Sequence, residues 1–337
     1  MAPLNDRPVS TLRFTARRIT QAALVLWVTT VLVFFGVHAV GDPIDVLVPP
    51  EASEAMRTEA AVRMGLDQPL PTQYARFAAN LLRGDFGTSF VYGAPVSELL
   101  LSRLSASLEL ALLATAGATL IGVVFGVAAA FRPRHLSSRL SAAVSLIGLS
   151  APTFCVGLML IFVFAVQLKW LPAGGRGPTQ SFLGAEWSLL TVAGWRHALL
   201  PALTMGAFQF ALMLRVVRAA TRTALQSDAV RYARAQGLPE TKVLWFHAGK
   251  PILLRIVAVL GIELGSTLAF GAVTETIFGW PGLGKLILDS ILYLDRPVVV
   301  AYLSLTAACF VLINLGTDLL LGWLDPRHRV DAGVGAS

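Results

Sequence analysis

Residues 231–251 read RYARAQGLPETKVLWFHAGKP, a polar stretch that lies between two strongly apolar segments. The chain as a whole is 55% hydrophobic and only 14% charged, whereas a soluble globular protein has about 25% charged residues. This composition indicates a membrane protein. The quoted stretch is then a segment that lies outside the lipid and connects two helices that cross it.

Six segments are apolar over the roughly 20 residues that a helix needs to cross a bilayer. They are residues 19–40, 108–131, 140–166, 198–217, 252–273 and 298–321. None alternates like a barrel strand, and backbone polar groups in lipid must be bonded within their own segment. The sequence therefore predicts an all-α multi-pass membrane protein with six transmembrane helices, the first of which is an uncleaved anchor.

The basic residues gather in alternate loops. Of the 27 Lys and Arg residues, 17 fall in segments that share one side of the membrane with the N-terminus. Because Lys and Arg collect on the cytoplasmic side, both termini and the quoted stretch are predicted to be cytoplasmic, in a prokaryotic inner or plasma membrane. The net charge of +7 follows from this topology, and no nucleic-acid partner is expected.

The apolar segments divide the chain into four parts. Residues 1–40 are expected to form a cytoplasmic N-terminus and the first transmembrane helix, and residues 41–106 an extracytoplasmic helical insert too small to be a stable domain alone. Residues 107–324 would form a five-helix core with a cytoplasmic loop at 220–250. Residues 325–337 would be a cytoplasmic tail, whose end is expected to be disordered.

Ionisable residues inside a membrane span are costly and are candidate functional residues. Glu263 lies near the centre of the fifth span and is expected to face a water-filled cavity or a partner. Asn314 and Asp318 are one helical turn apart on the sixth span. Asp318 is expected to pair with an arginine such as Arg215 or Arg218, either as a structural contact or as part of a pathway.

Three further features concern how the spans are shaped. Glu109 lies at the outer end of the second span, where interfacial water would solvate it. Pro152 in the third span removes a helical hydrogen bond and predicts a kink. Gly122 and Gly126 in the second span have the spacing that lets helices approach closely, and they predict a packing contact.

The stretch GWPGLGK at residues 279–285 matches part of a phosphate-binding loop. Leu286 stands where that loop needs Ser or Thr for magnesium, and the predicted topology places the stretch outside the cell. A turn that re-enters the outer mouth of the bundle is the favoured interpretation. Glu275, Trp280 and Pro281 therefore join Glu263 as candidates for lining or gating a pathway.

Enzymatic chemistry has little support in the sequence, because the five histidines are scattered and no HExxH, CxxC or GxSxG motif occurs. Two alternatives to a multi-subunit transporter remain open on the residues alone. One is a membrane-embedded enzyme using Glu263, Asp318 and the histidines. The other is an ion-coupled transporter that works alone, with Glu263 as its proton site.

The quoted stretch predicts two helices joined by a sharp turn. A helix is expected to continue from the fourth span over residues 221–236 and to end at Gly237 in a left-handed conformation. Pro239 suits the first turn of a second helix. The apolar residues that follow would offer contacts to a cytoplasmic partner; they are Val243, Leu244 and Trp245.

The segment SDAVRYARAQGLPETKVLWFHAGKPIL closely resembles the cytoplasmic loop of binding-protein-dependent ABC importer permeases, in their dipeptide, oligopeptide and nickel branch. The residues that match the pattern of this loop are Asp228, Val230, Arg231, Ala233, Arg234, Ala235, Gly237, Leu238, Val243 and His247. Segments such as GLDQPLPTQY, RGDFGTSF and LINLGTDLLLGWLDPRHR resemble the same branch in the same order. Ala229, Tyr232 and Gln236 depart from the pattern and would alter the partner interface.

The resemblance implies a type I ABC importer permease bundle that forms half of a translocation pathway and is not an enzyme. It implies as partners a second homologous permease subunit in a heterodimer, two ATPase subunits that bind ATP and Mg, and an extracytoplasmic substrate-binding protein. This chain would bind no cofactor. The solute would be a peptide or peptide-like molecule, with a nickel chelate, glutathione or a sugar as alternatives. The residues implied to contact the ATPase are Asp228, Arg231, Ala233, Arg234, Gly237, Leu238, Val243 and His247.

Overall fold

The computed structural model describes residues 11–38, 44, 48, 52–64, 66–131 and 135–325. Within them, five helices are long and apolar enough to cross a membrane, and there are six crossings if one bent pair of helices is counted as a broken span. The five are α1 (Thr11–His38), α5 (Val96–Phe131), α8 (Val192–Leu225), the continuous helix Glu240–Phe270 and α14 (Arg296–Leu324). The predicted all-α multi-pass architecture is confirmed, with five or six candidate spans for the six predicted. The predicted disordered end of the tail lies outside the described residues.

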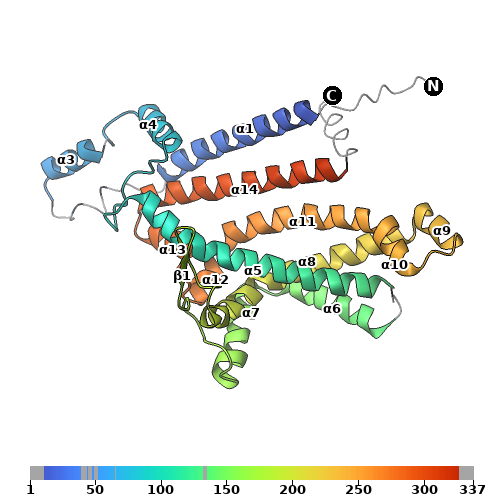
Figure 1. Ribbon diagram of the computed structural model, residues 1–337. Helices are drawn as coiled ribbons and strands as arrows, with labels where there is room; N and C mark the ends of the chain where they lie inside the picture. The colour runs from blue at the N-terminus through green and yellow to red at the C-terminus, as the bar shows by residue number, and fades with distance from the viewer. Residues whose placement is uncertain are drawn as a thin grey trace.

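The third crossing is the bent one. It consists of α6 (Leu136–Ser150) and α7 (Thr153–Leu160), and α7 continues into the π-helical turn η1 (Ile161–Gln167). Pro152 has an extended backbone, with φ −59° and ψ 131°, so the helix stops and restarts instead of bending smoothly. The two halves meet at 107°. The predicted kink is therefore a complete break, and α7 points away from the bundle (Figure 1).

The helices pack in two groups. In Figure 1, α1 lies along α14, while α5, α6 and α8 lie together on the other side of α11 (Gly249–Phe270). α5 packs closely on α8 at two glycines: a Cβ added at Gly126 would lie 2.9 Å from the Cβ of Val217, and one at Gly122 would lie 2.9 Å from the Cβ of Met213. This confirms the packing contact predicted from their spacing.

The region between the first two spans contains α3 (Glu54–Met64) and α4 (Leu70–Leu82). α4 packs on α1 through aromatic rings: the Phe34 ring lies 5.5 Å from the rings of Tyr74 and Phe77. The hydroxyl groups of Thr30 and Tyr74 are 3.1 Å apart.

Short elements complete the fold. The strands β1 (Gln180–Phe182) and β2 (Ala185–Trp187) form an antiparallel hairpin, with Ser181 opposite Glu186, that the sequence analysis did not predict. α12 (Ala272–Ile277) and α13 (Leu283–Leu292) flank the GWPGLGK turn. α9 (Asp228–Ala235), α10 (Glu240–Lys242) and the π-helical turn η2 (Val243–Ala248) contain the polar stretch quoted first.

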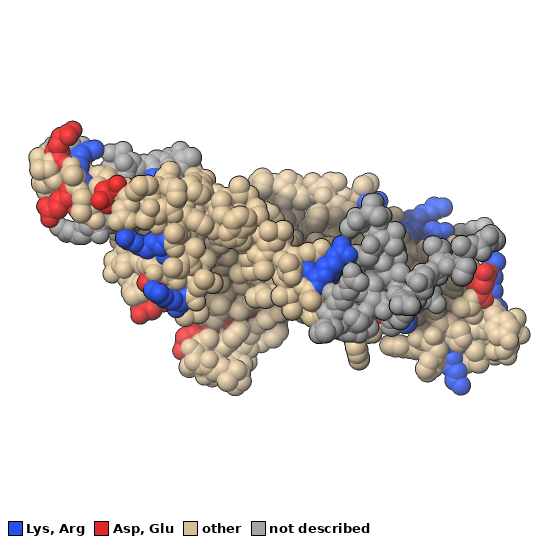
Figure 2. All heavy atoms as spheres, turned by 90° about the horizontal axis from the view of Figure 1, so that it is seen from above, with Lys and Arg blue, Asp and Glu red and all other residues tan. Residues whose placement is uncertain are grey.

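The molecule is elongated, and its two ends differ (Figure 1). The loop end consists of α9, α10 and η2, and the first turn of α1 and the last turn of α14 point toward the same side. The hairpin end holds the β-hairpin, α3, α4, α12 and α13. Figure 2 shows charged side chains toward both ends and an uncharged band between them. Such a band is what a bilayer requires.

Candidate functional site

At the loop end, the polar stretch begins with a break in the helix. α8 ends at Leu225, and α9 begins at Asp228 after Ser227, whose hydroxyl oxygen accepts a hydrogen bond from the Val230 N–H at 3.4 Å. Such a side-chain cap favours a new helix start. The continuous helix predicted over residues 221–236 was therefore wrong, since the chain changes direction before α9.

The turn at Gly237 has the predicted left-handed backbone, with a φ of +77°. The Leu238 N–H donates to the Ala233 carbonyl at 3.2 Å, which is the bond that closes a helix of this type. Across the turn, the Arg234 guanidinium donates two hydrogen bonds to Glu240, at 2.7 and 3.0 Å. This bonding raises the pKa of Arg234. The left-handed turn and these two hydrogen bonds thus connect α9 to α10.

The inward face of the loop is a small apolar core. Val230, Ala233, Val243 and Ala248 are all fully buried, and they pack in one cluster with residues of α8 such as Val217. The interpretation of Val243 as a contact offered to a partner was therefore wrong, because its side chain is used within the chain.

Two more of the matched residues lie beside this core. Leu238 packs against the cluster as a partly buried side chain. The Nδ1 atom of His247 is buried and has no hydrogen-bond partner among the described residues.

The outward face of the loop carries three exposed aromatic side chains. Tyr232 is 67% exposed, Trp245 is 77% exposed and Phe246 is 79% exposed; we call them the loop aromatics. Asp228 and Arg231 are also exposed, and their charged groups lie 3.7 Å apart. Three large aromatic side chains exposed together on one short loop favour a surface that another protein covers.

Glu263 borders a cavity inside the bundle. The cavity has a volume of about 340 Å³ and lies between α7, α8, α11 and α12. Gln209 and Thr267 also line it, and the Gln209 amide donates to the Thr267 hydroxyl, which in turn donates to the Glu263 carbonyl at 2.7 Å. The Glu263 carboxylate has no ion pair or hydrogen bond among the described residues. We call this space the Glu263 cavity, and it agrees with the expectation that Glu263 faces a cavity.

Two of the other candidates around the GWPGLGK turn, Glu275 and Trp280, are buried and hydrogen-bonded within the chain. Glu275 is 2% exposed; it accepts from the Ser107 hydroxyl at 2.6 Å and from the Lys285 N–H at 3.1 Å. Burial raises the pKa of this carboxyl. Trp280 is fully buried, and its indole N–H donates to the Ala106 carbonyl at 2.9 Å. Neither side chain lines the Glu263 cavity, and neither does that of Pro281.

The carboxylate of Glu109 forms a buried ion pair that was not predicted from the sequence. It is fully buried instead of solvated, and it accepts two hydrogen bonds from Arg176, at 3.1 and 2.9 Å. The Ser188 hydroxyl donates to the same carboxylate at 2.9 Å, and the Ser188 N–H also donates to it. Arg176 also donates to the Glu186 carbonyl at 2.6 Å. The ion pair therefore fixes the β-hairpin to α5, and the available sequence signal was a single arginine in the glycine-rich stretch GGRG.

Asp318 pairs with Arg18 of α1, and the charged groups are 3.0 Å apart. The expected partners Arg215 and Arg218 were therefore wrong. Asn314 donates to the Phe310 carbonyl of its own helix at 2.8 Å. Asn314, Asp318 and Arg18 all line a space of about 490 Å³ between α1 and α14, which is separate from the Glu263 cavity.

Comparison with known proteins identifies relatives over almost the whole chain. Residues 122–330 match the family model for binding-protein-dependent transport system inner membrane components, and residues 11–111 match the N-terminal model for membrane components of such systems. The glutathione transport system permease protein GsiC of Salmonella paratyphi A is 35% identical over 319 residues, which are 94% of this chain and 99% of the relative. GsiC of Escherichia coli K12 is similar to the same extent.

Proposed function

The chain belongs to the family of binding-protein-dependent transport system inner membrane components, and we propose that within this family it transports glutathione or another short peptide. The similarity to the two GsiC proteins supports this solute class. Glutathione is itself a tripeptide, so the proposal agrees with the peptide-like solute expected from the sequence. Nickel chelates and sugars remain the alternatives.

Membership of the family settles the general role. The chain is a permease subunit of an ABC importer, a multi-pass inner membrane protein, and not an enzyme. A permease of this kind works with ATPase and substrate-binding components. The membrane-embedded enzyme is thereby excluded.

The loop end is our proposed contact for the ATPase. The observation that carries this proposal is the exposure of the loop aromatics, Tyr232, Trp245 and Phe246, on a loop whose inward face is fully packed. Because ATP is hydrolysed in the cytoplasm, the loop end would be cytoplasmic. The start of α1 and the end of α14 point toward the same side (Figure 1), so both termini would be cytoplasmic as well.

We further propose that a second, homologous permease subunit completes the pathway in a heterodimer. The polar Glu263 cavity supports this proposal, because a carboxylate at membrane depth needs water or a partner around it. ATP-driven closure of two ATPase subunits would pull the two loop ends together. The bent α6–α7 crossing and the straight helices around the cavity would then move as rigid bodies and alternate the side to which the cavity opens.

The ATPase contact is tested with a double variant, Trp245→Ala/Phe246→Ala, in the assembled importer. Both side chains are exposed, so the permease should reach the membrane at normal levels while co-purification of the ATPase falls at least tenfold. Leu82→Ala is the matched control, because Leu82 is 89% exposed at the hairpin end. ATPase capture that is equal in the double variant and the control would refute the contact.

The solute is tested by ATP-dependent uptake of radiolabelled glutathione into proteoliposomes that contain the importer and its binding protein. Uptake that unlabelled short peptides inhibit, and that a nickel chelate or a sugar does not, is the expected result. Uptake of a sugar or a nickel chelate in place of glutathione would overturn the solute class without affecting the assignment as a permease.

A further inference from the structure

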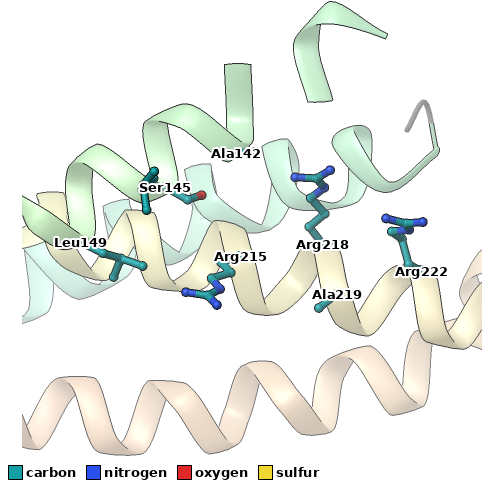
Figure 3. Close-up of a pocket in the computed structure, with 8 residues that line it drawn as sticks. Ala142, Ser145, Leu149, Arg215, Arg218, Ala219 and Arg222 are labelled. Atoms are coloured by element: carbon teal, nitrogen blue, oxygen red, sulfur yellow. The ribbon is translucent and has the colours of Figure 1, made fainter. Parts of the chain in front are cut away.

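A basic groove lies between α6 and α8, apart from the Glu263 cavity. It has a volume of about 470 Å³, and its basic wall consists of Arg215, Arg218 and Arg222 of α8. Ser145 and Leu149 of α6 lie opposite them (Figure 3). None of the three arginines makes an ion pair or a hydrogen bond with any other described residue. Three unneutralised guanidinium groups that share one groove repel one another and favour an anion between them.

The groove and the Glu263 cavity lie on one side of α8. Phe208 lines the cavity and Arg215 lines the groove. Residues seven apart on a helix share a face, because two turns contain about 7.2 residues. The same face therefore runs from the polar cavity in the middle of the bundle to the basic groove near the loop end. Gln209 at the cavity end and Arg215 at the groove end make both ends of this face polar, and polar or charged side chains within a membrane bundle typically face a cavity or the bundle interior and not lipid tails.

The three guanidinium groups are spread along α8 (Figure 3). Arg215 and Arg222 are seven residues apart, which corresponds to about 10 Å along the helix at 1.5 Å per residue. Guanidinium binds carboxylate through paired N–H donors. The groove is thus matched to a small solute with two carboxylates several ångströms apart, and it has no acidic lining residue to repel such a solute.

We propose that this basic groove is an anion-binding station on the exit route of the solute, and that it takes the carboxylates of a small acidic peptide. Glutathione, with its two carboxylates, is a solute of this class, so this inference rests on the proposed function. The groove would draw the solute from the Glu263 cavity toward the loop end. Because the three arginines are near the surface of the groove and open to salt, the attraction weakens as ionic strength rises.

The inference is tested by the reactivity of a single cysteine in the groove. Ala219 is exposed and lines the groove, so Ala219→Cys is introduced after Cys155→Ala and Cys309→Ala remove the two native thiols. Inside-out vesicles with the assembled importer are treated with an anionic sulfonatoethyl or a cationic trimethylammonioethyl methanethiosulfonate. Both rates are divided by the rates for a free thiol in solution. Ala142→Cys, also in the groove, is the second reporter if the first variant does not assemble.

The expected result is a normalised rate that is at least fivefold higher for the anionic reagent than for the cationic one. Arg215→Gln/Arg222→Gln should bring this ratio close to one, as should 1 M salt. Arg255→Gln is the matched control, because Arg255 is an exposed arginine of α11 outside the groove, and it should leave the ratio unchanged. Equal rates for both reagents would overturn the inference. A thiol that reacts only after detergent removes lipid would indicate a phospholipid headgroup and would also overturn it.

A second measurement connects the groove to transport. Uptake of glutathione is compared with uptake of its dimethyl ester, in which both carboxylates are blocked. The arginine double variant should lower glutathione uptake severalfold relative to the ester, and an unchanged ratio would contradict a role on the exit route. If the unaltered importer transports neither compound, the proposed solute fails, while the thiol experiment still decides whether the groove binds anions.

Discussion

The two ends of the molecule use charge in opposite ways. At the hairpin end, Glu109 and Glu275 are buried, and each accepts several hydrogen bonds from its own chain. At the loop end, the ion pairs are exposed and the arginines of the basic groove have no partner among the described residues. The difference indicates that the hairpin end is internally complete, whereas the loop end is built to interact with other molecules.

The largest effect is expected from breaking the ion pair that fixes the hairpin. Arg176→Gln leaves Glu109 buried without its cation, which should cost about 3–5 kcal/mol of folding free energy. Arg234→Gln at the loop end is the matched control, because its exposed pair with Glu240 should contribute less than about 1 kcal/mol. The measurement is the apparent midpoint of thermal unfolding in detergent.

A double variant sharpens this comparison. Glu109→Gln/Arg176→Gln removes both charges and should be more stable than Arg176→Gln alone. If Arg176→Gln and Arg234→Gln lower the midpoint equally, the buried ion pair at the hairpin end contributes no more to stability than the exposed pair at the loop end.

The next effect concerns the helix contact between the two ends. Gly126→Ala places a Cβ 2.9 Å from that of Val217, and such overpacking should cost about 1–3 kcal/mol. Gly117→Ala, in the same helix, meets nothing within 4 Å and should be neutral or stabilising by up to about 1 kcal/mol, because alanine favours helix more than glycine does. Thermal unfolding of both variants is the measurement, and equal midpoints would contradict the close contact.

At the loop end, Gly237→Val should separate stability from function. A branched residue at a φ of +77° costs about 1–2 kcal/mol, so the permease should still fold while the angle between α9 and α10 changes. We expect ATP hydrolysis by the assembled importer to continue with much less uptake per ATP. Gly237→Asn, which tolerates the left-handed region, should retain coupling. If ATP hydrolysis stays normally coupled to uptake in Gly237→Val, coupling does not require the left-handed turn at Gly237.

The smallest effect is a pH dependence at the hairpin end. Burial raises the pKa of Glu275 above the ordinary value of 4.5, so the folded state holds this proton more tightly than the unfolded state. The contribution of the group to stability is therefore greatest below pH 4.5, and it declines as the pH rises through the raised pKa. Glu275→Gln should flatten this part of a plot of thermal midpoint against pH. An unchanged slope would assign the dependence to another group.

Much of the fold could be predicted from hydropathy alone, because lipid demands long apolar helices and leaves few alternatives. The left-handed turn at Gly237 and the close approach at Gly126 were also predictable, because glycine in those settings has few other uses. Long-range pairings were not. The ion pairs Glu109–Arg176 and Asp318–Arg18 form because of how the helices pack. The spacing of these residues along the chain does not indicate that packing.

At the loop end, too, the sequence did not show which side chains pack against one another. Sequence pattern predicted that apolar side chains after Pro239 would face a partner, but it did not show which ones. Val243 faces the core and Trp245 and Phe246 face outward, because η2 winds as a π-helix and thereby changes which residues share a face. The basic groove escaped prediction because its arginines also satisfy the rule that positive residues stay on the cytoplasmic side.

The pair formed by Glu109 and Arg176 also has a consequence for biogenesis. The two residues are 67 positions apart in the chain, and the bent third crossing is synthesised between them. At about 5–20 residues per second, the ribosome adds Arg176 about 3–13 seconds after Glu109. For that interval the second span has been synthesised without the arginine that pairs with Glu109 in the folded chain, and the pair can form only after the loop that follows the third crossing has been translated.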